Sequence, residues 1–134
     1  MWETYMKRTT LKKSQLALGG ILTLHALSAM AGGLSLIAGK VDVPLSWLEG
    51  TGFTSYYFPG VILFALVGGS ALFALLAYIK KLSLAPYLSL LSGIIMLFWI
   101  LGEVVSIGQL HVLQVVYFFT ALTVIVLTPK SAKL

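Results

Sequence analysis

Residues Leu88–Gly108 read LSLLSGIIMLFWILGEVVSIG, an apolar segment interrupted near its end by the carboxylate of Glu103. About 20 apolar residues in helical conformation cross the hydrocarbon core of a bilayer, so this segment is long enough to span one. A charged side chain inside hydrocarbon costs about 2.5–3.5 kcal/mol on insertion scales. The segment therefore predicts a membrane helix whose carboxylate needs a partner, a proton or a function.

The composition extends this prediction to the whole chain. Of 134 residues, 59% are hydrophobic and 10% are charged, whereas a soluble domain carries about 25% charged residues. The chain contains no Cys, which excludes a structural disulfide, a thiolate metal site and dithiol redox chemistry. We expect one all-α membrane domain over residues 1–134, with the lipid bilayer as its surroundings.

Four apolar segments are each close to the length of a membrane span. Pro59 and Pro86 fall in predicted first helical turns, where the missing N–H costs little, and Pro129 is expected to stop the last helix. The sequence thus predicts a four-helix transmembrane bundle with spans at residues 16–37, 59–79, 84–107 and 110–127.

The first segment has an alternative interpretation as a cleaved signal peptide. The basic stretch KRTTLKK precedes an apolar run that contains an A-x-A pattern at Ala29–Ala31. Apolar character continues through Gly32–Ile37, however, which favours a retained span.

The basic residues predict one orientation of the bundle. They gather at the ends of the segments, and cytoplasmic basic residues flank membrane spans. Both termini and Lys80–Lys81 are therefore expected in the cytoplasm, which leaves Lys40 outside. The basic residues lack the aromatic interleaving and the motifs of nucleic-acid binding, so no nucleic-acid partner is expected.

The longest connection, residues 38–58, is then an outside loop between the first two spans. It is rich in aromatic side chains, which concentrate at membrane–water interfaces. Two interpretations stay open: the loop anchors the protein at the interface, or it forms a lid over an outward-facing pocket. The aromatic residues concerned are Trp47, Phe53, Tyr56, Tyr57 and Phe58.

Polar residues of the third span, together with Met96 and Trp99, recur at spacings of three and four, which places them on one helix face: Ser89, Ser92, Met96, Trp99, Glu103 and Ser106. Polar faces of membrane helices turn towards other helices or a cavity. Gln114 lies at a matching depth in the fourth span, after a very short turn. We therefore expect a hydrogen bond between Glu103 and Gln114.

This arrangement predicts an outer-leaflet pocket around Glu103 for a lipid-like or amphipathic small molecule. Apolar walls with a few converging polar groups are typical of ligand sites. The alternative is a structural contact only, in which the Glu103–Gln114 pair fixes helix packing. The predicted binding residues are Trp99, Glu103, Gln114 and Tyr117, with Tyr56 and Tyr57 as a roof and His111 at the mouth.

His25 lies near the middle of the first span and has two interpretations. It is an interhelical hydrogen-bonding residue, or it forms part of a proton path with Tyr117 and Glu103 in which water fills the gaps. Two small-xxx-small patterns, at Ala29–Gly33 and Ala65–Gly69, suit close helix packing within the chain or in a homo-oligomer.

No catalytic constellation is present, because the sequence lacks a Ser–His–Asp set, an HExxH motif and a phosphate-binding loop. We expect no enzymatic activity, no metal site and no cofactor. Three classes of function stay open: a binding or accessory protein, a small proton-coupled transporter or transporter subunit in which Glu103 titrates, and a structural subunit that docks a larger membrane partner.

Two motifs carry a resemblance to a known group of proteins. EGTGFTSYYFPGVILFALVGGS, Glu49–Ser70, contains G-[ST]-x-F-x-x-Y-x-x-P-G, and WILGEVVSIG, Trp99–Gly108, contains W-x-x-x-E-V-x-x-I-G. The chain resembles a group of small, uncharacterised four-span bacterial membrane proteins. A lesser similarity is to the DoxX-like four-helix proteins, whose acidic position in an earlier helix is not evident here. The resemblance implies a multi-pass protein of a bacterial plasma membrane and no particular activity.

Overall fold

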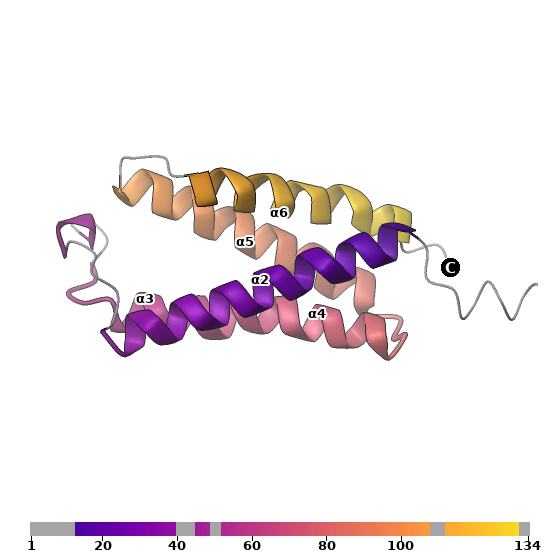
Figure 1. Ribbon diagram of the computed structural model, residues 1–134, viewed down its shortest axis with the longest axis horizontal. Coiled ribbons are helices and arrows are strands. Elements are labelled where there is room, and N and C mark those ends of the chain that lie inside the picture. Colours follow the sequence, from indigo (N-terminus) through magenta and orange to yellow (C-terminus); the bar gives the residue numbers. More distant parts are fainter. Residues whose placement is uncertain (1–12, 40–44, 49–51, 108–111, 132–134) are drawn as a thin grey trace, which may run out of the picture.

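The computed structural model describes residues 13–39, 45–48, 52–107 and 112–131, and this part of the chain is helical without any β-strand (Figure 1). Five of the described elements are α-helices, and two more are a short 3₁₀ helix and a π-helical segment. In chain order they are α2 (Lys13–Ile37), η1 (Leu45–Leu48), α3 (Tyr57–Ile62), η2 (Leu63–Gly68), α4 (Gly69–Ile79), α5 (Ala85–Ile107) and α6 (Val112–Ser131).

Three helical stretches among the described residues are long and apolar enough to cross a membrane: Gln15–Ile37, Tyr57–Ile79 and Ala85–Val105. A shorter apolar helix covers Val112–Thr128. In Figure 1 the start of α2, the turn from α4 to α5 and the end of α6 lie at one end of the molecule. The start of α3, the end of α5 and the start of α6 lie at the other end, so Glu103, near the end of α5, is far from Lys80–Lys81.

The predicted helix boundaries agree with the structure to within a few residues, with one error at the C-terminal helix. Helix α6 continues to Ser131 and includes Pro129, so the prediction that this proline stops the helix is wrong. A proline removes its own N–H bond and crowds the preceding turn, but residues after it can keep helical dihedral angles.

The second helical rod contains a π-helical segment that the sequence did not predict. Elements α3, η2 and α4 follow one another without a break from Tyr57 to Ile79, and η2 occupies the middle of this rod. In a regular α-helix, Gly60 and Gly68 would lie about 80° apart around the axis. A π turn holds more residues than an α turn, and here both glycines face α2.

These glycines bring α2 and the second rod into backbone contact. A Cβ atom placed on Gly33 would lie 2.7 Å from the Gly60 carbonyl oxygen, and one placed on Gly68 would lie 2.8 Å from Met30 Cγ. The Ala29–Gly33 pattern is therefore used for packing within the chain. Gly69 of the second pattern has no such neighbour, because a Cβ there would meet nothing within 4 Å.

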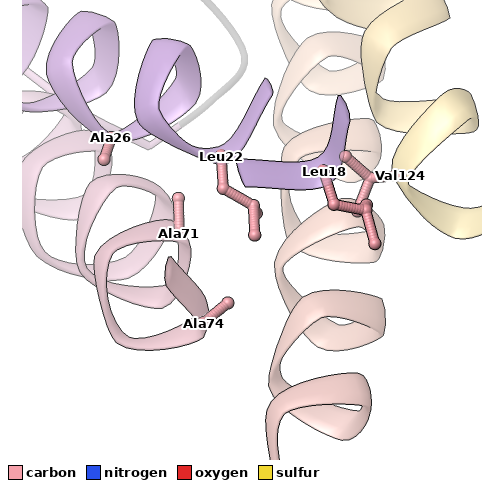
Figure 2. Close-up of a cluster of buried hydrophobic side chains, with 6 residues drawn as sticks. All are labelled: Leu18, Leu22, Ala26, Ala71, Ala74 and Val124. Atoms are coloured by element: carbon pink, nitrogen blue, oxygen red, sulfur yellow. The ribbon is translucent and has the colours of Figure 1, made fainter. Parts of the chain in front are cut away.

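The interior is built from small and medium-sized apolar side chains. Figure 2 shows one cluster in which Leu18 and Leu22 of α2 meet alanines of α4 and Val124 of α6. A second cluster, nearer the Glu103 end, joins α2, η2, α5 and α6 through Ala29, Val67, Met96, Ile100 and Ala121. Large apolar residues such as Phe73 and Phe98 are exposed instead, as expected for surfaces that face lipid.

The glycine contact leads to a test of the packing between α2 and the second rod. Gly33→Ala should lower the free energy of unfolding by about 1–3 kcal/mol, because the new methyl group overlaps backbone atoms of Gly60 and Phe64. Gly20→Ala is the matched control on the same helix, since a Cβ at Gly20 meets nothing within 4 Å. Unfolding in mixed micelles by a denaturing detergent measures both variants, and equal stability of the two would contradict the packing described here.

Candidate functional site

The polar face predicted for the third span is present on α5. Ser89, Ser92 and Met96 are buried inside the molecule, while Trp99 and Glu103 are partly buried. The side chain of Ser106 lies outside the described residues. The spacing of three and four therefore identified the inward face of α5 correctly.

Glu103 is the centre of a hydrogen-bonded cluster formed by two helices. The indole Nε1 of Trp99 donates to Glu103 Oε1 at 2.7 Å, one helical turn away on α5. The amide Nε2 of Gln114, on α6, donates to Glu103 Oε2 at 3.3 Å. The predicted hydrogen bond between Glu103 and Gln114 is thus confirmed, and Trp99 is a further donor to the same carboxyl group.

The carboxyl group of Glu103 is a hydrogen-bond acceptor that its neighbours hold in one orientation. Each carboxyl oxygen receives an N–H from a neutral side chain, so the two donors fix the plane of the carboxyl group without supplying a positive charge. A carboxylate offers about four acceptor positions, which can accommodate donors beyond Trp99 and Gln114. Because Glu103 is only partly buried, an ammonium or hydroxyl group of a ligand can approach it from the protein surface.

The other predicted site residues are spread around this end of the molecule. Tyr117 is partly buried on α6, and its ring centroid lies 5.8 Å from that of His25. Tyr56 is the N-cap residue of α3 without a side-chain capping bond, and burial raises the pKa of its phenol. Tyr57 is half exposed and its ring packs edge-on against Phe58 at 5.4 Å.

Among the described residues of the long connection, η1 packs against α5. This 3₁₀ helix has the sequence LSWL and contains Trp47. The sequence analysis named Trp47 as one of the aromatic residues of this loop, but it did not predict a contact between this part of the loop and α5. His111 and Glu49 lie outside the described residues.

His25 is fully buried and bonded to a partner that the sequence did not reveal. Its Nε2 lies 2.8 Å from Thr120 Oγ1 on α6. The Thr120 hydroxyl gives its hydrogen to the Tyr117 carbonyl oxygen at 3.1 Å, so it accepts the hydrogen of His25 Nε2. This pairing assigns the ring hydrogen to Nε2, and Nδ1 is buried without a hydrogen-bond partner among the described residues.

A second threonine of α6 repeats this arrangement near the opposite end. Thr128 Oγ1 donates to the Val124 carbonyl oxygen at 2.6 Å and accepts a hydrogen bond from Ser89 Oγ at 2.9 Å. Between the two threonine contacts, Ser92 Oγ is buried and lacks a partner within the described part of the chain. An unsatisfied buried polar group costs about 1–3 kcal/mol.

The sequence analysis missed Thr120 and Thr128, although the signal that would have found them was present. Gln114, Tyr117, Thr120 and Thr128 share one face of α6 at the helical period, as the polar residues of α5 do. The threonines were overlooked because a hydroxyl that bonds the preceding turn does not interrupt an apolar span.

A pocket of about 400 Å³ lies away from Glu103, between the second rod and α5. None of the predicted site residues lines it, and Ser70, its one polar side chain, donates to the Val67 carbonyl oxygen at 3.1 Å. Such a groove suits a hydrocarbon chain rather than a polar head group. Its lining residues are Ala65, Leu66, Gly69, Ser70, Phe73, Leu88, Leu91 and Ile95.

Comparison of the chain with protein-family models, with curated proteins and with solved structures gives no match. The described residues hold no group of three His, Cys, Asp or Glu side chains that could bind a metal ion.

The Glu103 cluster can be tested through stability. Glu103→Ala should lower the free energy of unfolding by about 1 kcal/mol, since hydrogen bonds within membranes contribute about 0.6 kcal/mol each. Glu103→Gln keeps an acceptor for Trp99, so its free energy of unfolding should fall by less than half of the decrease expected for Glu103→Ala. Val105→Ala, an exposed position on the same helix, controls for the loss of side-chain volume. Equal stability of the alanine and glutamine variants would contradict a hydrogen-bonding role for the carboxyl group.

Proposed function

We propose that this protein is a four-span membrane protein that binds the head group of an amphipathic ligand at the Trp99–Glu103–Gln114 cluster. The observation that supports this best is the carboxyl group of Glu103, which two donors from two helices orient while it stays partly accessible. A purely structural cluster would gain little from a charge at this position, because the insertion cost of about 2.5–3.5 kcal/mol exceeds the contribution of the hydrogen bonds from Trp99 and Gln114, about 0.6 kcal/mol each.

An amphipathic ligand suits the position of the cluster. Glu103 lies four residues before the end of α5, about 6 Å along the helix axis, which places it just below a membrane interface. A polar or cationic head group there would meet the carboxylate, and its tail would extend along apolar side chains. Phe98 and Val105 on α5 are largely exposed and provide such a surface.

Four spans and a single orientation belong to the same proposal. The apolar part of α6, Val112–Thr128, is about 25 Å long, near the lower limit for a membrane span. Lys80 and Lys81 are exposed at the turn between α4 and α5, and the positive-inside rule assigns this turn to the cytoplasm. The Glu103 cluster then lies in the outer leaflet of a plasma membrane.

Cysteine accessibility tests the orientation, because the chain has no native Cys. In intact cells, an impermeant thiol reagent should label Ser46→Cys, whereas Lys80→Cys should react only after the membrane is opened. Both positions are exposed, so reactivity reports the side of the membrane. The reverse labelling pattern would place the Glu103 cluster in the inner leaflet and contradict the proposed site.

Native mass spectrometry of the purified protein tests ligand binding. The wild-type protein should retain a small amphipathic molecule, and Glu103→Gln should lower its affinity about 10-fold or more, because a hydrogen bond to a charged group contributes about 1.5–3 kcal/mol. Tyr87→Phe, an exposed position at the other end of α5, should retain the molecule fully. Equal retention by wild type and Glu103→Gln would reject the site, and a retained protein subunit in place of a small molecule would favour the docking alternative.

A further inference from the structure

The apolar groove between the second rod and α5 leads to the turn that connects these two elements. On the rod, Phe73 lines the groove, and Leu76 and Lys80 follow it at spacings of three and four, which places all three on one helix face. All three are exposed, so this face points away from the interior of the molecule. One wall of the groove therefore continues along apolar side chains to a lysine.

The opposite wall follows α5 to the same turn. Leu88, Leu91 and Ile95 line the groove at spacings of three and four, on one face of the helix. The Leu88 N–H donates to the Leu84 carbonyl oxygen at 3.0 Å, so Leu84, just before α5, lies one helical turn from Leu88. Both walls thus meet at the connection over residues 80–84, which is exposed throughout.

This turn has a lysine at a position where glycine is the usual residue. Lys81 has a φ of 55°, in the left-handed region. Its N–H donates to the Tyr78 carbonyl oxygen at 3.1 Å, and the Leu82 N–H donates to the Ala77 carbonyl oxygen at 2.9 Å. These two bonds define a Schellman C-cap, in which glycine avoids the steric cost that a Cβ atom brings. Because the Lys81 side chain is exposed, packing does not account for this choice, whereas a contact outside the protein does.

The charge at this end of the molecule is of one sign among the described residues. The exposed side chains of Lys13, Lys80 and Lys81 lie there (Figure 1). In the part of the chain that the structure describes, the only acidic side chain is Glu103, near the opposite end. A phosphate group at the turn is therefore attracted by lysines, and no described carboxylate competes with it.

We propose that the Lys80–Lys81 turn and the groove together bind one anionic phospholipid, with its phosphate at the two lysines and an acyl chain in the groove. Ala65, at the far end of the groove, is fifteen residues before Lys80, about 22 Å at the rise of an α-helix. Half of a bilayer that includes its head groups is about 20–22 Å thick, so the groove ends near the midplane, as an acyl chain of one leaflet does.

Each part of this lipid meets a group of matching chemistry. Lysine ammonium groups donate hydrogen bonds and bind phosphate as point charges. Each lysine near a membrane surface raises the affinity for anionic lipid about 5-fold. The groove itself suits only the hydrocarbon chain, because the hydrogen of the Ser70 hydroxyl is already donated to the Val67 carbonyl oxygen.

The lipid site is separate from the ligand site proposed at Glu103, since the two lie near opposite ends of the molecule. In the orientation proposed above, the bound lipid belongs to the cytoplasmic leaflet. The reverse orientation would place it in the other leaflet and leave the contacts unchanged, so the two proposals can fail independently.

Native mass spectrometry of protein released from vesicles of equal parts phosphatidylglycerol and phosphatidylcholine tests the head-group contact. The wild-type protein should retain phosphatidylglycerol in preference, and Lys80→Gln combined with Lys81→Gly should lower this preference about 25-fold, 5-fold for each lysine. Glycine removes the strain at position 81, so the Lys81→Gly variant should resist unfolding at least as well as the wild type. Lys13→Gln is the matched control, because Lys13 is exposed at the same end but belongs to α2, which does not line the groove.

A second pair of variants tests the acyl-chain contact. Gly69→Leu places a side chain in the groove and should remove most of the retained phosphatidylglycerol, whereas Gly20→Leu on α2 should retain it. A Cβ at either glycine meets nothing within 4 Å, so both variants should fold.

Three results would overturn the proposal: equal retention of the two lipids by the wild type, the same loss for Lys13→Gln as for the turn variant, or equal retention by Gly69→Leu and Gly20→Leu. A dimer in the wild-type spectrum that Gly69→Leu abolishes would assign the groove to a second copy of the chain and overturn it as well.

Discussion

The close contact between α2 and the rod formed by α3, η2 and α4 is the constraint on which the rest of the structure depends. Helices in lipid gain little from hydrophobic burial and associate through tight packing, so small residues at their contacts are decisive. Gly33 meets Gly60 with backbone atoms nearly touching, and Gly68, eight residues further along the second rod, meets Met30. This contact fixes the rotation of α2 about its axis, and with it the direction in which His25 points.

The π-helical segment is a consequence of the same contact. It lets two glycines that an α-helix would place on different faces lie against one neighbour. Once α2 is fixed in this way, an adjacent side, about 80° around its axis from Gly33, presents His25 to α6, where its Nε2 lies 2.8 Å from Thr120 Oγ1. The glycine contact between apolar helices therefore also determines the position of His25, the central polar residue.

The contact between α5 and α6 arranges the remaining polar groups. Glu103 meets Gln114 near one end of these helices and Ser89 meets Thr128 near the other, so one antiparallel register aligns both pairs. Gly93 permits this approach, since a Cβ there would lie 3.0 Å from Ile125 Cγ1. Threonine hydroxyls on α6 satisfy their own backbone and still accept a hydrogen bond, which lets α6 remain apolar in sequence while it carries polar contacts inside the molecule.

The sequence by itself determined the helical class, the positions of the apolar helices, the inward face of α5 and the pairing of Glu103 with Gln114. These follow from local hydrophobicity, helical period and a short connection, which act over a few residues. The tertiary structure alone decided the π-helical segment, the use of Gly68 instead of Gly69, and the bond from His25 to Thr120. Those features depend on which residues of distant helices approach one another, and hydropathy contains no information about the rotation of one helix against the next.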